Sequence, residues 1–458
     1  MKVIICGAGQ VGYGIAERLS QEGNDVSVID TSASLVSHIT ETLDVSGYVG
    51  HGAHPDVLAR AGADQAEMLI AVTLYDEINM TACQVAHSLF NVPTKIARIR
   101  SQNYLRPEYS DLFSRDNLPI DVTISPEIEV GKMVLRRISF PGATDIVRFA
   151  DDHIAMLAIE CMEDCPVVDT PLNQLSELFP DLMATVCAIY RNGRLNVARS
   201  QDHLQVGDLA YVICQRDHAR RTLGLFGHEE QEAGRIIIAG GGNIGYYVAR
   251  AIEEMQPKTR LKIIENDRER ALAVSDQLKD GIVLHGSALD QNILQQADIQ
   301  DADLMVTLTN NDQTNILSAA MAKRLGCKSG MALINSPSFH ELATSIGIDA
   351  HINPRAVTIS RVLQHVRKGR IRAVYAVQKG KAEVIEAEAL ETSPLVGKPF
   401  RELELPPGLR IGAILRDKTV IRPYGDTKIK AKDRVVLFAA ADAVRHVEQL
   451  FRVTIQYF

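Results

Sequence analysis

Gly7-Ala8-Gly9-Gln10-Val11-Gly12 follows the apolar run Val3-Ile4-Ile5-Cys6 at the start of the chain. A second copy of the pattern, Gly240-Gly241-Gly242-Asn243-Ile244-Gly245, follows the apolar run 236–239 about half a chain later. GxGxxG between a strand and a helix is typical of dinucleotide-binding folds. Two copies in matching contexts predict an internal duplication with two nucleotide sites. At each site, a glycine turn that holds no ligand is the alternative.

The repeat continues beyond the glycines. In the first half, a helix is expected after the glycine loop, and the next strand ends at Asp30; in the second half, the corresponding strand ends at Glu265. Later segments also correspond, such as Thr73-x-x-Asp76-x-x-Asn79 and Thr309-x-x-Asp312-x-x-Asn315. Strands that alternate with helices predict α/β, doubly wound, Rossmann-like domains with a parallel sheet covered on both faces.

Each glycine loop has a specific chemistry. Gly7 permits a tight turn, Gly9 lets the backbone approach a pyrophosphate, and Gly12 lets the helix pack closely. The N–H groups and the dipole at the helix start favour a phosphate. Asp30 and Glu265 are expected to accept hydrogen bonds from ribose hydroxyls. Because an acid repels a 2′-phosphate, NAD(H) or an unmodified adenosine nucleotide such as ATP or ADP is expected rather than NADP.

Further candidates follow later strands, at the edge where open parallel sheets bind ligands. Arg98 is expected to reach a phosphate or ribose, or else to be a solvated arginine at a strand end. The matching segment 328–333 has no arginine, so the two sites are expected to differ in phosphate affinity or ligand. The candidate cofactor-binding residues are Gly7, Ala8, Gly9, Gln10, Val11, Gly12, Asp30, Thr73, Leu74, Arg98, Gly240, Gly241, Gly242, Asn243, Ile244, Gly245, Glu265, Thr309 and Asn310.

Four domains are expected in the order A-B-A′-B′. Two nucleotide-binding domains at 1–126 and 233–354 alternate with small α+β domains at 140–225 and 370–458. Helices at 127–138 and 355–367 carry apolar stripes at i, i+3, i+4 spacing. Such a stripe packs on its own domain or is buried against another subunit.

Composition narrows the function. The 458 residues contain 49 Lys and Arg against 57 Asp and Glu, a net charge of −8, and no Trp. Nucleic acid is therefore a poor candidate partner, although a basic stretch lies at Arg361, Arg367, Lys368, Arg370 and Arg372. No run approaches the ~20 apolar residues of a membrane span, and the N-terminus enters a strand without a signal peptide. We expect a soluble protein whose membrane association comes through a partner.

Cysteine and histidine do not indicate a metal site. The seven cysteines are scattered through apolar segments, as is typical of reduced, buried thiols. Cys161 and Cys165 form a pair, but no second pair or histidine cluster completes a zinc set. His51 and His54 are interpreted as loop residues. A dehydrogenase needs an acid–base group near the nicotinamide, and the B domains offer no concentrated set of such residues. An NAD-dependent oxidoreductase with a duplicated fold therefore remains only the alternative function.

The tandem order with its two motif sets resembles the TrkA family, the RCK-type (KTN) nucleotide-binding regulators of bacterial Trk potassium uptake. The A units resemble RCK-type nucleotide-binding domains, and the B units resemble TrkA-C domains. The resemblance implies a regulatory protein that is not an enzyme, peripheral on the cytoplasmic face of the inner membrane. It further implies a homo-oligomeric ring, a dimer or tetramer, beneath a membrane-embedded potassium-translocating subunit. Nucleotide binding would bias the shape of the ring and hence the pore.

Overall fold

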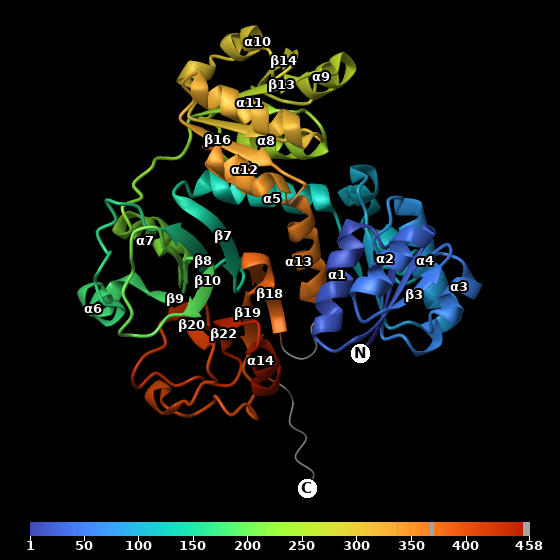
Figure 1. The fold of residues 1–458 in the computed structure, drawn as a ribbon, viewed down its shortest axis with the longest axis horizontal. Coiled ribbons are helices and arrows are strands. Elements are labelled where there is room, and N and C mark those ends of the chain that lie inside the picture. The colour runs from blue at the N-terminus through green and yellow to red at the C-terminus, as the bar shows by residue number, and fades with distance from the viewer. Residues whose placement is uncertain (337, 367–370, 452–458) are drawn as a thin grey trace. The chain divides into compact units, whose positions relative to one another are not determined.

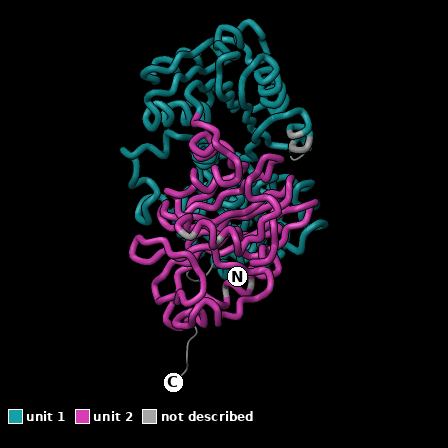
Figure 2. The backbone as a smooth tube through the Cα atoms, turned by 90° about the vertical axis from the view of Figure 1, so that its left-hand side faces the viewer, with its two compact units in different colours: residues 1–135, 233–366 teal, residues 136–232, 367–458 magenta. Residues whose placement is uncertain are grey.

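The computed structural model describes residues 1–336, 338–366 and 371–451. The chain forms two compact units, each built from two separate segments (Figure 2). The first unit combines residues 1–135 with 233–366, and the second combines 136–232 with 367–458. Three members of the basic stretch (Arg367, Lys368 and Arg370), the end of the expected helix 355–367, and both ends of the expected domain 370–458 lie outside the described residues.

The first unit contains two six-stranded sheets of the same topology, and every strand pair in them is parallel. The strand orders are β3-β2-β1-β4-β5-β6 and β14-β13-β12-β15-β16-β17. Each is the doubly wound order, in which the first strand of the half lies next to the point where the winding reverses. The strands are β1 Lys2–Cys6, β2 Asp25–Asp30, β3 Ser46–Val49, β4 Met68–Ala71, β5 Thr94–Arg98, β6 Val122–Ile124, β12 Arg235–Ala239, β13 Arg260–Glu265, β14 Ile282–His285, β15 Leu304–Thr307, β16 Ser329–Leu333 and β17 Ala350–Ile352.

Helices connect these strands and bury one apolar face each against the sheets. In the first helix after the first glycine loop, Ile15, Ala16 and Leu19 are fully buried at i, i+1, i+4 spacing. The helices are α1 Gln10–Gln21, α2 Ala33–Thr42, α3 Pro55–Arg60, α4 Asp76–Phe90, α5 Pro126–Ser139, α8 Asn243–Met255, α9 Arg268–Ser275, α10 Gln291–Gln296, α11 Asp312–Arg324, α12 Ser338–Ser345 and α13 Pro354–Val366. Short 3₁₀ turns lie at Ala63–Gln65, Gln102–Leu105, Pro107–Phe113 and Ile299–Asp301.

The first unit consists of two halves, residues 1–135 and 233–366, and the last helix of each, α5 or α13, which we call the crossover helix, packs on the other half. In α13, the stripe residues Val362, Leu363 and Val366 belong to the core that α1 and β1 form in the first half. In α5, Gly131 lies directly against Tyr247 of α8 in the second half. The stripes were expected on their own domain or on another subunit. In the structure each crossover helix lies on the other half of the same unit, where α13 runs beside α1 (Figure 1).

The second unit contains two five-stranded antiparallel sheets, ordered β10-β9-β11-β8-β7 and β18-β19-β22-β20-β21. The strands are β7 Ala143–Phe149, β8 Ile154–Glu160, β9 Ala184–Arg191, β10 Arg194–Val197, β11 Leu209–Gln215, β18 Ile371–Val377, β19 Ala382–Glu388, β20 Leu409–Arg416, β21 Thr419–Ile421 and β22 Arg434–Ala440. The helices are α6 Leu172–Leu178, α7 Ala219–Leu225 and α14 Val444–Leu450, and 3₁₀ turns lie at Pro180–Leu182, Arg216–His218, Gln378–Gly380 and Phe400–Glu402.

A repeated ion pair shows that the second unit is duplicated as well. Arg191 contacts buried Asp208 at 2.6 Å, and Arg416 contacts buried Asp433 at 2.7 Å. The two sheets also share one core, to which Ile213 and Phe438 contribute from different halves. The expected fold class is therefore confirmed: two Rossmann-like parallel-sheet domains, each followed by a small antiparallel-sheet domain. Among the described residues, no helix has the length and apolar character needed to span a bilayer.

Candidate functional site

The two glycine loops have the same backbone geometry. Gly7 and Gly240 have φ angles of 114° and 103°, in the left-handed region that favours glycine. A Cβ on Gly12 would lie 1.8 Å from the carbonyl oxygen of Gly7, and Gly245 repeats this contact with Gly240 at 1.9 Å. The third glycine of each loop therefore lets the helix pack directly on the turn, as the sequence predicted.

The middle glycine of each loop faces open space. A Cβ on Gly9 or Gly242 would meet no atom within 4 Å, and these residues are the N-caps of α1 and α8 without a side-chain cap. The first-turn N–H groups of both helices consequently receive no side-chain acceptor from their caps. An anion at this point would supply the missing acceptors and interact favourably with the helix dipole.

The two acids bind the backbone of their own loops. Asp30 accepts a hydrogen bond from the N–H of Ala8 at 2.7 Å and one from Ser32 at 2.8 Å. Glu265 accepts from Gly241 at 2.6 Å and from Asp267 at 2.8 Å. Each carboxylate oxygen keeps further acceptor capacity. The acids therefore hold the loop in shape, in addition to the ribose-binding role predicted for them.

The threonines after β4 and β15 are held by asparagines. Asn79 accepts hydrogen bonds from the Thr73 N–H and hydroxyl at 2.9 and 2.7 Å and donates to the Arg98 carbonyl at 2.9 Å. Asn315 accepts from Thr309 at the same two distances and donates to the Leu333 carbonyl. Both asparagines are fully buried. The Thr-x-x-Asp-x-x-Asn spacing is thus a structural motif that fixes the strand ends beside each glycine loop.

The same hydrogen bonds define which residues correspond between the halves. Arg98 matches Leu333, since each carbonyl accepts from the motif asparagine. Arg100 matches Asn335, because their N–H groups donate to Asp76 and to Asp312. The first half therefore carries two arginines where the second half carries a leucine and an asparagine.

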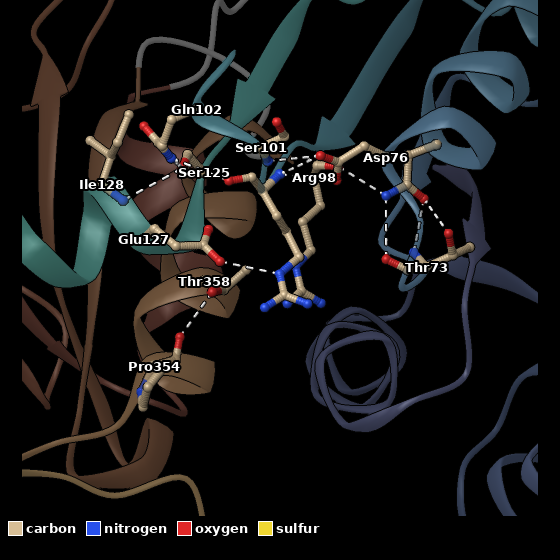
Figure 3. A network of polar contacts seen from close by, with 12 residues as sticks. Thr73, Asp76, Arg98, Ser101, Gln102, Ser125, Glu127, Ile128, Pro354 and Thr358 are labelled. Carbon is tan, nitrogen blue, oxygen red and sulfur yellow. Dashed lines mark hydrogen bonds and ion pairs between the residues drawn. The ribbon is translucent and has the colours of Figure 1, made fainter. Parts of the chain in front are cut away.

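Arg98 and Glu127 lie near each other at the end of the first sheet (Figure 3), and Arg100 joins them through its contact with Glu127. Arg100 Nε donates to Glu127 Oε1 at 3.1 Å. The other oxygen of Glu127 and the Nε of Arg98 are buried without a hydrogen-bond partner. Burial, followed by the charge of Arg100, lowers the pKa of the Arg98 guanidinium. An anionic ligand next to Arg98 would offset both effects.

One cavity of about 1390 Å³ in the first unit is lined by both glycine loops. Of the predicted residues, all line it except Ala8, Gly12, Gly241 and Gly245, which face the loop acids or the turns instead. The N-terminal parts of both crossover helices line the same cavity, through Glu127 in α5 and through Arg355 and Thr358 in α13. Both glycine loops and the starts of both crossover helices therefore border the same cavity.

Several lining residues were missed from sequence: Arg100, Glu127, Arg270 and Arg355. In the second half, Arg270 donates from Nε to the Gly241 carbonyl at 2.7 Å and lies over the Tyr246 ring. The second site thus has cations nearby, although its strand has no arginine. A signal for Arg270 was present in its position shortly after Glu265, at the start of the next helix.

Metal ligation receives no structural support in the part of the chain that is described. All seven cysteines are buried free thiols, and the described residues include no cluster of three or more metal-ligating side chains. The His51 and His54 rings stack on each other with centroids 4.6 Å apart.

The fold defines a tandem class of protein, in which two Rossmann-like domains alternate with two small antiparallel-sheet domains. The TrkA-N domain family matches residues 3–126 and 236–354, and the TrkA-C domain family matches 156–227 and 384–452. The Trk system potassium uptake protein TrkA of Azorhizobium caulinodans is 58% identical over 458 residues, covering 100% of both chains. That of Halomonas elongata is 39% identical over 462 residues, again covering 100% of both chains. The chain belongs to the TrkA family.

A solved structure shares the fold. The GsuK channel bound to NAD matches with a TM-score of 0.60 and 18% identity, covering 98% of this chain and 78% of that chain. At this identity the likeness concerns the fold alone.

Proposed function

We propose that the protein is the nucleotide-binding regulatory subunit of a Trk-type potassium uptake system and not an enzyme. It would be peripheral on the cytoplasmic face of the bacterial inner membrane, as a homo-oligomeric ring, a dimer or a tetramer, bound to a membrane-embedded potassium-translocating subunit. The full-length similarity to Trk system potassium uptake proteins supports this assignment. The observation that carries the mechanism is the single cavity shared by both glycine loops and both crossover helices.

The proposed ligands are NAD(H) and, at one or both sites, ATP or ADP. The loop acids support an unmodified ribose, because a 2′-phosphate would lie against the carboxylate of Asp30 or Glu265. The related fold of GsuK is described with NAD bound. Gly7 through Gly12 would hold the pyrophosphate at the first site, with Thr73, Leu74 and Arg98 around it. Gly240 through Gly245, Thr309 and Asn310 would do so at the second.

The two kinds of repeated domain would have different roles. Domains at 1–126 and 233–354 would bind nucleotides, and the small domains at 140–225 and 370–458 would assemble or contact partners. A ligand shifts a protein between two shapes only if it binds them with different affinity. Glu127 at the start of α5 and Arg355 at the start of α13 would provide this difference in affinity. A phosphate bound at a glycine loop would repel Glu127 and attract Arg355, and the strength of each effect would depend on the distance between the phosphate and the helix start in each shape.

Calorimetric titration of the purified full chain with NADH, NAD⁺, ATP and ADP tests the proposal. Asp30→Ala and Glu265→Ala should each weaken binding at one site and leave the other measurable. Asp64→Ala, at an exposed carboxylate that does not line the cavity, is the matched control and should bind as the parent does. If none of the four nucleotides binds, the nucleotide role is refuted.

Co-purification tests the partner. The membrane-embedded potassium-translocating subunit of the Trk system should bind the full chain. Potassium flux through that subunit should change with the nucleotide added. Flux that does not depend on this protein under any nucleotide would refute the regulatory role. The alternative of an NAD-dependent oxidoreductase predicts that NADH absorbance falls when candidate substrates are added. A regulatory protein should leave this absorbance unchanged in the same mixtures.

A further inference from the structure

Two contacts in the first unit each bring a glycine against a large side chain. On α1, a Cβ at Gly14 would lie 2.4 Å from Cδ1 of Ile359 on α13. On α5, a Cβ at Gly131 would lie 2.3 Å from Cδ1 of Tyr247 on α8. A side chain at Gly131 would require the Tyr247 ring to move, and a side chain at Gly14 would require the Cδ1 end of Ile359 to turn away. Each contact joins the helix after a glycine loop to the crossover helix of the other half.

The four residues correspond to one another through the repeat. Gly14 and Tyr247 both lie two positions after the last glycine of their loop. Gly131 and Ile359 both lie five positions after the proline that begins their crossover helix. At one contact the glycine is on the loop helix, and at the other it is on the crossover helix. The two contacts therefore occupy equivalent positions, but the glycine and the large residue exchange places between them.

Pairing of each crossover helix with its own half would lose this match. The equivalent contact in the first half would set Gly14 opposite Gly131, where no side chain fills the space. In the second half it would set Tyr247 opposite Ile359, where two large side chains occupy the space of one. Cavities and overpacking both destabilise a helix interface.

We propose that these two contacts form a size code that directs each crossover helix to the opposite half and rejects pairing of like halves. The code acts on any partner that presents these helices, whether the same chain or a second copy of it. A ring assembled through the crossover helices would consequently join first halves to second halves only. The inference is independent of the nucleotide proposal, since none of the four residues lines the cavity.

Exchange of side-chain size tests the code with full-length variants. The crossover exchange, Gly131→Ile with Ile359→Gly, and the loop-helix exchange, Gly14→Tyr with Tyr247→Gly, each mismatch both contacts. The four-position variant combines them and returns one large and one small residue to each contact. Parent and variants all carry two glycines, one isoleucine and one tyrosine at these positions, so the intrinsic cost of glycine in a helix is closely balanced.

Thermal unfolding midpoints and hydrogen exchange give the readout. Each two-position variant should unfold about 5 °C or more below the parent, with faster amide exchange in α5 and α13. The four-position variant should regain most of the midpoint and the protection. If a two-position variant does not fold, recovery of folded protein in the four-position variant is the supporting result. A four-position variant no more stable than either exchange, or two-position variants as stable as the parent, would overturn the code.

Discussion

Arg98 is an arginine whose charge is incompletely compensated. Its guanidinium lines the cavity, its Nε has no hydrogen-bond partner, and burial lowers its pKa. Leaving a buried charged donor without a partner costs free energy, and the phosphate of the proposed nucleotide would remove this cost. Leu333 occupies the same place in the second half, so the second site lacks this cation, as it lacks the one at Arg100.

Replacement of Arg98 by the residue of the second half measures its contribution. Arg98→Leu should weaken NADH or ATP binding at the first site by about tenfold or more, as expected for loss of a charge-assisted hydrogen bond to phosphate. Calorimetry resolves the two sites. Arg324→Leu, at an exposed position of α11, is the control and should leave both affinities unchanged; equal affinity in Arg98→Leu would contradict the assignment.

Glu127 should oppose a bound phosphate. Its carboxylate neutralises Arg100 and places negative charge in the cavity. Glu127→Gln keeps an acceptor for Arg100 but removes the charge, so ATP should bind about three- to tenfold more tightly at low salt, with a smaller gain at high salt. Equilibrium titrations at several ionic strengths check this. Glu41→Gln, exposed on α2, should show no such gain, and weaker binding in Glu127→Gln would rule out repulsion.

Sequence located the loops but only part of the charge around them. The glycines, Asp30 and Glu265 follow from local spacing, because each strand–turn–helix–strand unit contains one glycine loop and its own acid. Arg100 and Glu127 come from different elements and meet only when β5 and β6 pair in register. Their pairing depends on tertiary structure, and no local pattern encodes it.

At the scale of elements, the crossover helices carry the main departure from expectation. Their apolar stripes predict burial but do not say against which surface, since any apolar groove satisfies a stripe. Val362 and Leu363 enter the core of the opposite half. That choice depends on side-chain shape at the contact, which a hydrophobic pattern does not contain.

Truncation of the α13 stripe should therefore destabilise the first half. Leu363→Ala removes a side chain that is 4% exposed and should cost about 2–5 kcal/mol of unfolding free energy. Urea unfolding, followed by hydrogen exchange in α1, measures the effect. Leu317→Ala, at a 51% exposed leucine of α11, should change the stability by about 0.5 kcal/mol or less. Equal effects of the two substitutions would place the stripe outside the core.

The whole molecule keeps its thiols inside. Burial raises the pKa of Cys6, Cys187 and Cys214 to about 12, and all seven cysteines are buried. Since the thiolate is the reactive form, these cysteines are inert while the domains remain folded.

Thiol titration checks this inertness. With Ellman's reagent at pH 8, the native protein should release less than about one equivalent rapidly, because both access and ionisation are blocked. The denatured chain should release all seven. If the native protein and the urea-denatured chain released thiols at the same rate, the reagent would be reaching the thiols without unfolding.

The interleaved build of the two units has a consequence for biosynthesis. The first half has its own sheet, yet its core is completed by Val362, Leu363 and Val366, which leave the ribosome after most of the chain. The second unit likewise joins 136–232 to 367–458 in one shared core. Contacts between such distant segments slow folding and leave apolar surface uncovered in the meantime. The nascent chain must therefore wait, with incomplete cores, until translation is nearly finished, and it should rely on chaperones during that interval.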